Sequence, residues 1–253
     1  VAPSRGLGDV YKRQIYGGAN AVLTADITVN PGTFDTDGSY TPKESENVRD
    51  WTPIGNGSLS YSGTFDGQGH TISGLYFSNE STDYVGLFGY VLDGTVKNVG
   101  VVASYLHGQS YIGGVVGYLQ ANGANSSASV ENCYNTGIVK GTLEVGGVVG
   151  TLYSSGESSK ASIENCYNTG KVNGGTNSYY VGGVAGGNYA SNNGTASIEN
   201  CYYLKDCATD GNVPQNGIGA SSNGNATDDV EGEDNTVCLL YTSPSPRDGA
   251  TSR

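Results

Sequence analysis

The sequence ENCYNTG at residues 131–137 recurs without change at 164–170, and its first four letters recur in ENCYY at 199–203. A glycine-rich apolar stretch precedes each copy: IGGVVG at 112–117, VGGVVG at 145–150 and VGGVAG at 181–186. Self-similarity at a nearly fixed period is the signature of a fold in which repeated units stack on one another. The repetition therefore predicts a solenoid in which one repeat forms one coil.

The residues around each Asn-Cys pair align into columns. The aligned rows begin at Ile72, Val96, Val130, Ile163 and Ile198, with spacings of 24, 34, 33 and 35 residues. The first and fourth columns are apolar or Cys, which suits the interior, and the second is Ser, Lys or Glu, which suits water. The third column is Gly or Asn, which most easily take a left-handed backbone conformation, so the strand should bend there. The corner column holds Gly74, Asn98, Asn132, Asn165 and Asn200, and the inward column ends with Cys133, Cys166 and Cys201.

This alternation predicts an all-β fold, a right-handed single-stranded parallel β-helix of about five to six coils, with the hand following crossover chirality. The shortest spacing suggests a bare coil of three strands. Longer repeats then carry polar loops at 119–129, 154–162 and 188–197, which should project from one side. We expect the β-helix to span residues 15–207 and a polar, acidic loop or linker to span 208–237.

The two ends have a separate origin. SRGLGDVYKRQ at 4–14 and CLLYTSPSPRD at 238–248 can be encoded by reverse-complementary nucleotide strings. That string resembles a transposase adapter used in sequencing libraries. We therefore interpret residues 1–14 and 238–253 as non-native, adapter-derived sequence and exclude them from the fold prediction.

Composition narrows the function. The two ends hold five of the 12 basic and two of the 24 acidic residues, which leaves 7 basic against 22 acidic groups between them. This acidic balance argues against nucleic acid as a partner, because phosphate binding needs a basic patch. No apolar run approaches the length of a membrane span, so we expect no membrane insertion in this segment.

The column after the inward residues suggests a binding surface. It holds Tyr76, Tyr134, Tyr167 and Tyr202. Exposed tyrosine rings can stack on sugar rings or act as hot spots for a protein partner. The alternative is that the rings pack beneath the inserted loops.

The remaining candidates for chemistry point to structural roles. Asp35 to Gly38 lacks the ligand spacing of an EF-hand, and His70 and His107 lack a metal-ligand partner at suitable spacing, so we expect no metal and no cofactor. The stacked Glu131, Glu164 and Glu199 could hold a cation or form a solvated face. The first three native cysteines suit stacked inward thiols, while a bridge from Cys201 to Cys207 is a further possibility.

Together, WTPIG at 51–55, FDGQGHTISGLYFSN at 65–79, YVGLFG at 84–89, the VGGVVG copies and ENCYNTG resemble the GLUG-repeat surface proteins of gut bacteria. The resemblance covers about residues 21–207. It implies a parallel β-helix in a secreted or cell-surface protein and carries over no catalytic residue.

We therefore expect a non-catalytic adhesin or stalk, extracellular or on the cell surface, with glycans or surface proteins as partners. One alternative is an accessory region of a secreted protease or polysaccharide-degrading enzyme. Another is a solenoid polysaccharide lyase or hydrolase, which would require acidic and basic residues clustered across adjacent coils.

Overall fold

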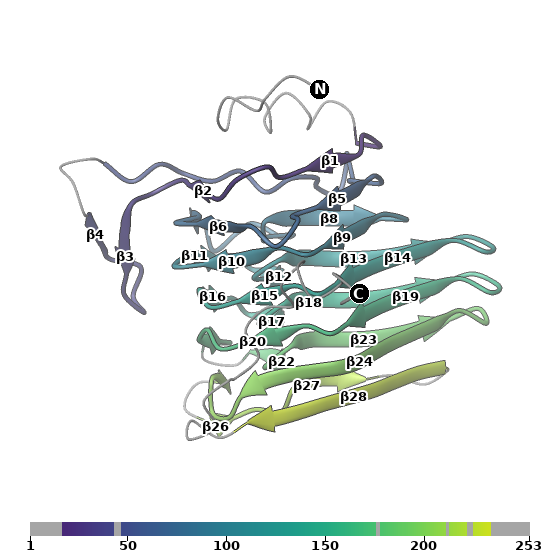
Figure 1. The fold of residues 1–253 in the computed structure, drawn as a ribbon. Coiled ribbons are helices and arrows are strands. Elements are labelled where there is room, and N and C mark those ends of the chain that lie inside the picture. The colour runs from purple at the N-terminus through teal and green to yellow at the C-terminus, as the bar shows by residue number, and fades with distance from the viewer. Residues whose placement is uncertain (1–16, 43–46, 176–177, 211–212, 222–224, 234–253) are drawn as a thin grey trace, which may run out of the picture.

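The computed structural model describes residues 17–42, 47–175, 178–210, 213–221 and 225–233. The two ends interpreted as adapter-derived lie outside these residues. The described chain contains strands and turns and no helix, and its strands stack in parallel as a solenoid of about five turns (Figure 1). The predicted all-β solenoid is therefore confirmed.

Each complete coil contains five short strands rather than the three expected from the shortest spacing. The coil with the clearest repeat consists of β13 (Val116–Asn122), β14 (Ser127–Glu131), β15 (Tyr134–Asn135), β16 (Ile138–Lys140) and β17 (Leu143–Gly146). The coil before it consists of β8 (Phe88–Leu92), β9 (Thr95–Lys97), β10 (Gly100–Val102), β11 (Tyr105–His107) and β12 (Ser110–Gly113). The coil after it consists of β18 (Val149–Ser155), β19 (Lys160–Glu164), β20 (Tyr167–Asn168), β21 (Val172–Asn173) and β22 (Tyr179–Gly182).

Equivalent strands of successive coils form the sheets. One sheet follows the order β8, β13, β18, β23 (Ala185–Ser191) and β27 (Ile218–Ser221). The largest sheet runs from β1 (Ala21–Val22) through β5 (Thr64–Asp66), β9, β14 and β19 to the long strand β24 (Thr195–Leu204). It then returns through β20, β15, β10, β6 (Thr71–Ser73) and β2 (Ile27–Thr28), because β24 continues around a corner that interrupts the earlier coils.

The pairing corrects the register of the earliest aligned row. Phe65, and not Ile72, pairs with Val96, so the column spacings are 31, 34, 33 and 35 residues. Ile72 instead pairs with Val101 on the next face. The corner that follows Ile72 and the corner that follows Val96 have the same local pattern: an apolar strand residue, a polar residue, a left-handed residue and an inward apolar residue. Gly74 has φ +72 and lies at the second corner, beside Ala103 with φ 46, so it is not part of the asparagine column.

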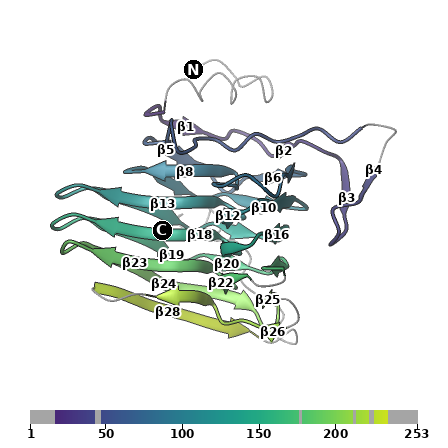
Figure 2. The same ribbon diagram turned by 180° about the vertical axis from the view of Figure 1, so that it is seen from behind.

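The polar segments expected to be loops are mostly strand. Strands β13 and β14 both extend outward, as do β18 with β19 and β23 with β24, so only the turns at 123–126, 156–159 and 192–194 remain. These paired extensions project from one side of the solenoid, as predicted (Figures 1 and 2). Small buried side chains fill the space between their two layers, among them Ala121, Ala128, Ser154 and Ser159. We refer to this thin projecting part as the flange.

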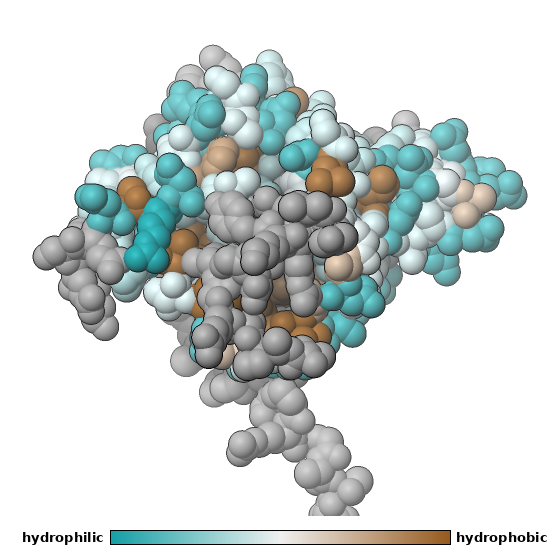
Figure 3. All heavy atoms as spheres, turned by 90° about the horizontal axis from the view of Figure 1, so that it is seen from above, coloured by the Kyte–Doolittle hydropathy of each residue, from teal (hydrophilic) through white to brown (hydrophobic). Residues whose placement is uncertain are grey.

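The core is a set of ladders along the solenoid axis. Val130, Ile163 and Ile198 are fully buried in consecutive coils, and so are Leu119 and Leu152. Seen from the N-terminal end, brown apolar side chains appear among teal polar ones where grey atoms do not cover the face (Figure 3).

Polar side chains also stack inside the tube. Asn135 and Asn168 are fully buried, and Asn135 Nδ2 donates to Asn168 Oδ1 at 2.8 Å. Each side chain also bonds the backbone two residues ahead, at Gly137 and Gly170 respectively. The amides thus satisfy one another and the turn of each NTG motif, which makes a buried polar ladder tolerable.

Two segments differ from the predicted boundaries or add to the solenoid. Strands continue beyond residue 207, because β25 (Ala208–Asp210) pairs with β21, β27 with β23, and β28 (Asn225–Glu233) with β24. The prediction of a loop or linker over 208–237 is therefore wrong for its described part.

Near the N-terminus, the hairpin of β3 (Gly32–Phe34) and β4 (Tyr40–Pro42) lies on the side opposite the flange, near β7 (Tyr76–Ser78) and β11 (Figures 1 and 2). The short strand β26 (Val213–Pro214) pairs antiparallel with β25.

Candidate ligand-binding surface

The tyrosine column predicted from the sequence forms on three coils. Tyr134 pairs with Tyr167, and Tyr167 with Tyr202. The rings of Tyr134 and Tyr167 stack 4.8 Å apart at an angle of 2°. Both side chains are half-buried, and burial raises the pKa of Tyr167 to about 12. A Cβ at Gly100, one coil earlier, would lie 2.2 Å from the Tyr134 ring, so this ring lies flat along the ladder.

Tyr76 belongs to another face. It pairs with Tyr105 on β11, and the Phe34 ring from the β3–β4 hairpin stacks on it at 5.3 Å. The misaligned first row placed Tyr76 beside Tyr134, and the observed pairing separates the two residues. Of the four predicted tyrosines, the structure therefore brings together Tyr134, Tyr167 and Tyr202 only.

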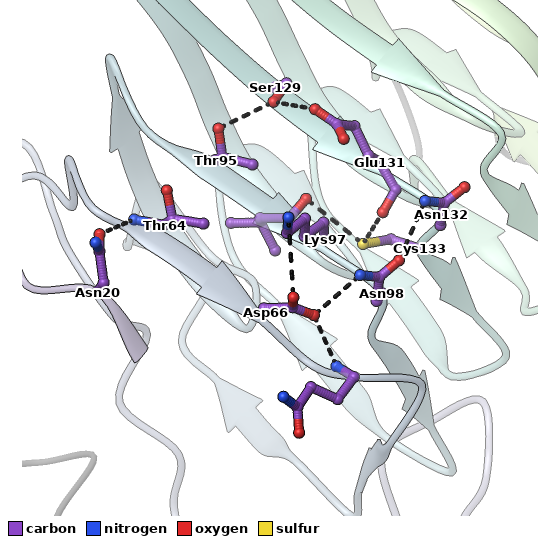
Figure 4. Close-up of polar contacts among 12 residues, drawn as sticks. Asn20, Thr64, Asp66, Thr95, Lys97, Asn98, Ser129, Glu131, Asn132 and Cys133 are labelled. Carbon is purple, nitrogen blue, oxygen red and sulfur yellow. Dashed lines mark hydrogen bonds and ion pairs between the residues drawn. The ribbon is translucent and has the colours of Figure 1, made fainter. Parts of the chain in front are cut away.

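The asparagine corner has the expected backbone. Asn98, Asn132, Asn165 and Asn200 have φ values of 55, 53, 53 and 51. Asn132 Nδ2 donates to Asn98 Oδ1 at 3.1 Å, and Asn98 Nδ2 donates to Asp66 Oδ1 at 2.9 Å (Figure 4). The other Asp66 oxygen lies 3.8 Å from Lys97 Nζ. These contacts link neighbouring coils at the corner, so the polar side chains named here have structural partners.

The outward column beside this corner holds Lys97, Glu131, Glu164 and Glu199 in register. Ser129 donates to Glu131 at 2.7 Å (Figure 4). Ser73 lies on the neighbouring face. Among the described residues, no group of three His, Cys, Asp or Glu side chains is arranged to hold a metal ion.

The cysteines form an inward ladder. Cys133, Cys166 and Cys201 are buried, and each thiol donates to the backbone carbonyl two residues before it, at 3.2 Å. Burial raises the pKa of the Cys166 thiol well above its ordinary value. Cys207 is also buried with a free thiol, beside Asn168, so it is not bridged to Cys201.

The histidines have local partners. His70 Nδ1 lies 3.3 Å from Asp26, whose pKa is lowered mainly by the hydrogen bond from the Thr71 backbone. His107 is buried beside Tyr105, with Nε2 3.6 Å from Glu80, and burial lowers its pKa. In the short acidic loop, Asp37 accepts hydrogen bonds from Ser39.

A larger aromatic group, not predicted from the sequence, lies where the β12–β17–β22 sheet turns into the β8–β13–β18–β23 sheet. We call it the tyrosine surface: Tyr84, Tyr90, Tyr111, Tyr118, Tyr153, Tyr180 and Tyr189. The Tyr84 ring stacks on Tyr90 at 5.5 Å and on Tyr111 at 5.1 Å. Tyr118 meets all three edge-on, with centroids 5.0 to 5.9 Å away, so the four rings form one packed cluster.

One column of this surface has an unusual backbone. Tyr84, Tyr111, Glu144 and Tyr180 occupy equivalent positions in four consecutive coils. Their φ values are 63, 60, 55 and 63, in the left-handed region that favours glycine and asparagine. The other corner of the same coils satisfies this requirement with asparagine. Three tyrosines and a glutamate therefore occupy positions at which asparagine or glycine would be less strained.

Glu144 provides the polar group in the column. Its two carboxylate oxygens accept hydrogen bonds from Thr151 Oγ1 at 2.6 Å and from the Tyr189 hydroxyl at 3.0 Å. The Tyr189 ring lies over Gly187, where a Cβ would be 2.4 Å from the ring. Burial raises the pKa of Tyr189, and the negative charge of Glu144 raises it further. The carboxylate is thus held by two donors, while each oxygen keeps a second acceptor position.

A sequence signal for this surface exists. The residue before each glycine-rich motif is Tyr84, Tyr111, Glu144 or Tyr180, one position outside the apolar stretches that define the repeat. The aromatic character of this position is hidden by the glutamate in the third coil.

The architecture is that of a repeat-built parallel β-solenoid whose coils carry aromatic ladders. Residues 108–140 and 141–173 each match the GLUG motif, so the chain carries GLUG repeats and the resemblance to GLUG-repeat sequences is confirmed over these residues. None of the curated proteins compared matches the chain. Among solved structures, it is similar to the 1.30 Å crystal structure of a "putative immunoglobulin A1 protease" from Bacteroides ovatus, with 19% identity over 86% of this chain and 78% of that one, and a TM-score of 0.46. No helix in the described part of the chain is long and apolar enough to span a membrane.

Proposed function

We propose that this chain is a non-catalytic module of a secreted or cell-surface bacterial protein, an adhesin or stalk that binds glycans or proteins. The observation that carries the proposal is the tyrosine surface, with six tyrosines on strands of consecutive coils and Tyr84 directly before the bridge of Val85 with Ile112. Tyrosine offers a large, rigid contact area with a polar tip and loses little conformational entropy on binding.

The solenoid supports such a role by fixing the spacing of the rings. Each coil contributes one residue to each ladder, and neighbouring coils lie about 4.8 Å apart. Backbone pairing on both sides therefore sets where each ring stands before any ligand arrives. A preorganised surface loses less free energy to ordering when it binds.

The proposal is tested by immobilising the full chain and measuring binding to mucin glycoprotein, to soluble neutral polysaccharides and to extracellular matrix proteins. We expect saturable binding to at least one probe, without release of new reducing ends or peptide fragments. Catalytic turnover of a bound probe would contradict the proposed function, and so would the absence of binding to any of the probes.

A further inference from the structure

The ladder of corner residues on the tyrosine surface has a gap one ring wide. Tyr84 and Tyr111 stack at 5.1 Å, and the next ring in the same column is Tyr180, two coils beyond Tyr111. Two coil steps separate these backbone positions by about 10 Å. Since the ring stacks of this protein are about 5 Å apart, that separation equals two stacking distances and accommodates one further flat ring.

Glu144 occupies the intervening ladder position without filling it with an aromatic ring. Its carboxylate is hydrogen-bonded to Thr151 and Tyr189, both on the adjacent β18 and β23 strands. Tyr180 is 46% exposed and its neighbour Tyr179 is 63% exposed, so this end of the column faces solvent. A ring that entered the gap would have tyrosines on both sides and carboxylate acceptors at one edge.

The electrostatics define which ring suits the gap. Strands β8, β12, β13, β17, β18, β22 and β23 carry no lysine or arginine, whereas Glu144 lies in the column itself. A carboxylate accepts hydrogen bonds from hydroxyl groups and repels sulfate, phosphate and carboxylate substituents. A planar apolar ligand would leave the acceptors unmatched. A pyranose ring has apolar C–H faces for the tyrosines and equatorial hydroxyls for the carboxylate.

The strained corner supports a binding role over a packing role. A bulky residue in the left-handed region is strained relative to glycine, because its Cβ crowds the backbone. Among the described aromatic contacts, the Tyr180 ring meets the Tyr179 ring alone, at 6.3 Å, and 46% of Tyr180 stays exposed. Asparagine serves the same backbone need at the opposite corner of these coils.

We propose that Tyr111, Glu144 and Tyr180 form a subsite for one sugar ring of a neutral oligosaccharide. This inference rests on the proposed function and specifies its ligand and its location. Tyr111 and Tyr180 would contact the two faces of the sugar, and Glu144 would accept from its hydroxyl groups.

The test is calorimetric titration of the full chain with neutral oligosaccharides of glucose, mannose, xylose and N-acetylglucosamine, with oligogalacturonate as the acidic probe. We expect at least one neutral probe to bind and the acidic probe not to bind. Tyr180→Ala should weaken binding by about tenfold or more, since it removes one face of the subsite. Glu144→Gln should do the same, since it removes the charge and replaces one acceptor oxygen by an NH2 donor. Tyr167→Ala, on the separate tyrosine column, serves as the matched control and should leave the affinity unchanged.

Folding of each variant is checked by its thermal transition, so that lost binding is not mistaken for lost structure. If Tyr167→Ala abolishes binding while Tyr180→Ala and Glu144→Gln retain it, the subsite is wrong and the proposed function stands. If no neutral oligosaccharide binds but an extracellular protein does, the subsite is likewise overturned and the module remains a binder. Preferential binding of oligogalacturonate would overturn the assignment of a neutral ligand.

Discussion

Gly147 lies directly against the side chain of Asn168 across the interior of the solenoid. A Cβ at Gly147 would be 2.3 Å from Cγ of Asn168 and 2.2 Å from the carbonyl oxygen of Gly183. The same relation recurs between Gly114 and Asn135, at 2.4 Å. The second glycine of the GG motif and the asparagine of the NTG motif therefore belong to one contact, which explains why the two motifs recur together.

Gly147→Ala should therefore destabilise the solenoid strongly. The added methyl group meets a buried, hydrogen-bonded amide on one side and backbone on the other, and neither can move freely. We expect the free energy of unfolding to fall by about 3 kcal/mol, measured by urea denaturation. The matched control is Gly18→Ala, where the nearest atom to the new Cβ is 3.4 Å away and little change is expected. A loss below about 0.5 kcal/mol at Gly147 would show that the contact is not tight.

Tyr180→Asn should stabilise the fold while weakening oligosaccharide binding. The residue has φ 63, which asparagine adopts more readily than tyrosine, and its ring is half-exposed. We expect a gain of about 0.5 to 1 kcal/mol in unfolding free energy. Tyr179→Asn is the matched control, because Tyr179 has no left-handed backbone and should show no gain. A destabilised Tyr180→Asn variant would mean that the ring contributes to packing after all.

The thiols of the cysteine ladder should be unreactive toward alkylating reagents in the folded protein. Cys133, Cys166, Cys201 and Cys207 are buried, and burial raises the thiol pKa of Cys166 and, to about 11, that of Cys207. Since the thiolate is the reactive form, iodoacetamide at pH 8 should label these four residues in urea and leave them unlabelled in the native state. Peptide mass mapping assigns each site. Fast native labelling of Cys166 would show that the ladder opens locally.

Alkaline pH should destabilise the fold. The folded pKa of Tyr167 is about 12, against an ordinary value of 10.0, and that of Cys207 is about 11, against 9.0. Because these groups hold their protons more tightly when folded, unfolding releases protons above the ordinary pKa values. Stability should therefore be level from pH 7 to about 9 and then fall as the pH rises toward 12. The midpoint of urea denaturation across this range measures the slope, and Tyr167→Phe should make the slope shallower. A midpoint that rises with pH would contradict the assignment.

The repeated motifs made the parallel solenoid predictable, because inward, outward and corner residues alternate at a fixed spacing in the three best-conserved copies. The register of the first row was not predictable from the same pattern. Ile72 to Leu75 and Val96 to Val99 look alike because both pass through a left-handed corner, yet they occupy different corners of the coil. Only the pairing of Phe65 with Val96 distinguishes them.

The tyrosine surface was harder to predict for a different reason. Its members come from two sheets and several coils, so they are far apart in the sequence, and only the corner column has a local signal, one position before each glycine-rich motif. Tyr189 reaches Glu144 across 45 positions of the chain, and Gly187 provides the space for its ring. Such a relation depends on how one sheet turns into the next, which repeat spacing alone does not specify.

Each side-chain ladder runs along the solenoid axis, at right angles to the strands, and each coil contributes one residue to it. The corner ladder reads Tyr84, Tyr111, Glu144, Tyr180. Loss of one repeat, such as residues 141–173, would remove the glutamate and bring Tyr111 and Tyr180 into adjacent coils, while backbone pairing would close over the deletion. Slippage or recombination between near-identical repeats in the gene would therefore change the residues of the surface in one step and keep the fold. Ligand preference can then evolve through a change in the number of coils as well as through point mutation.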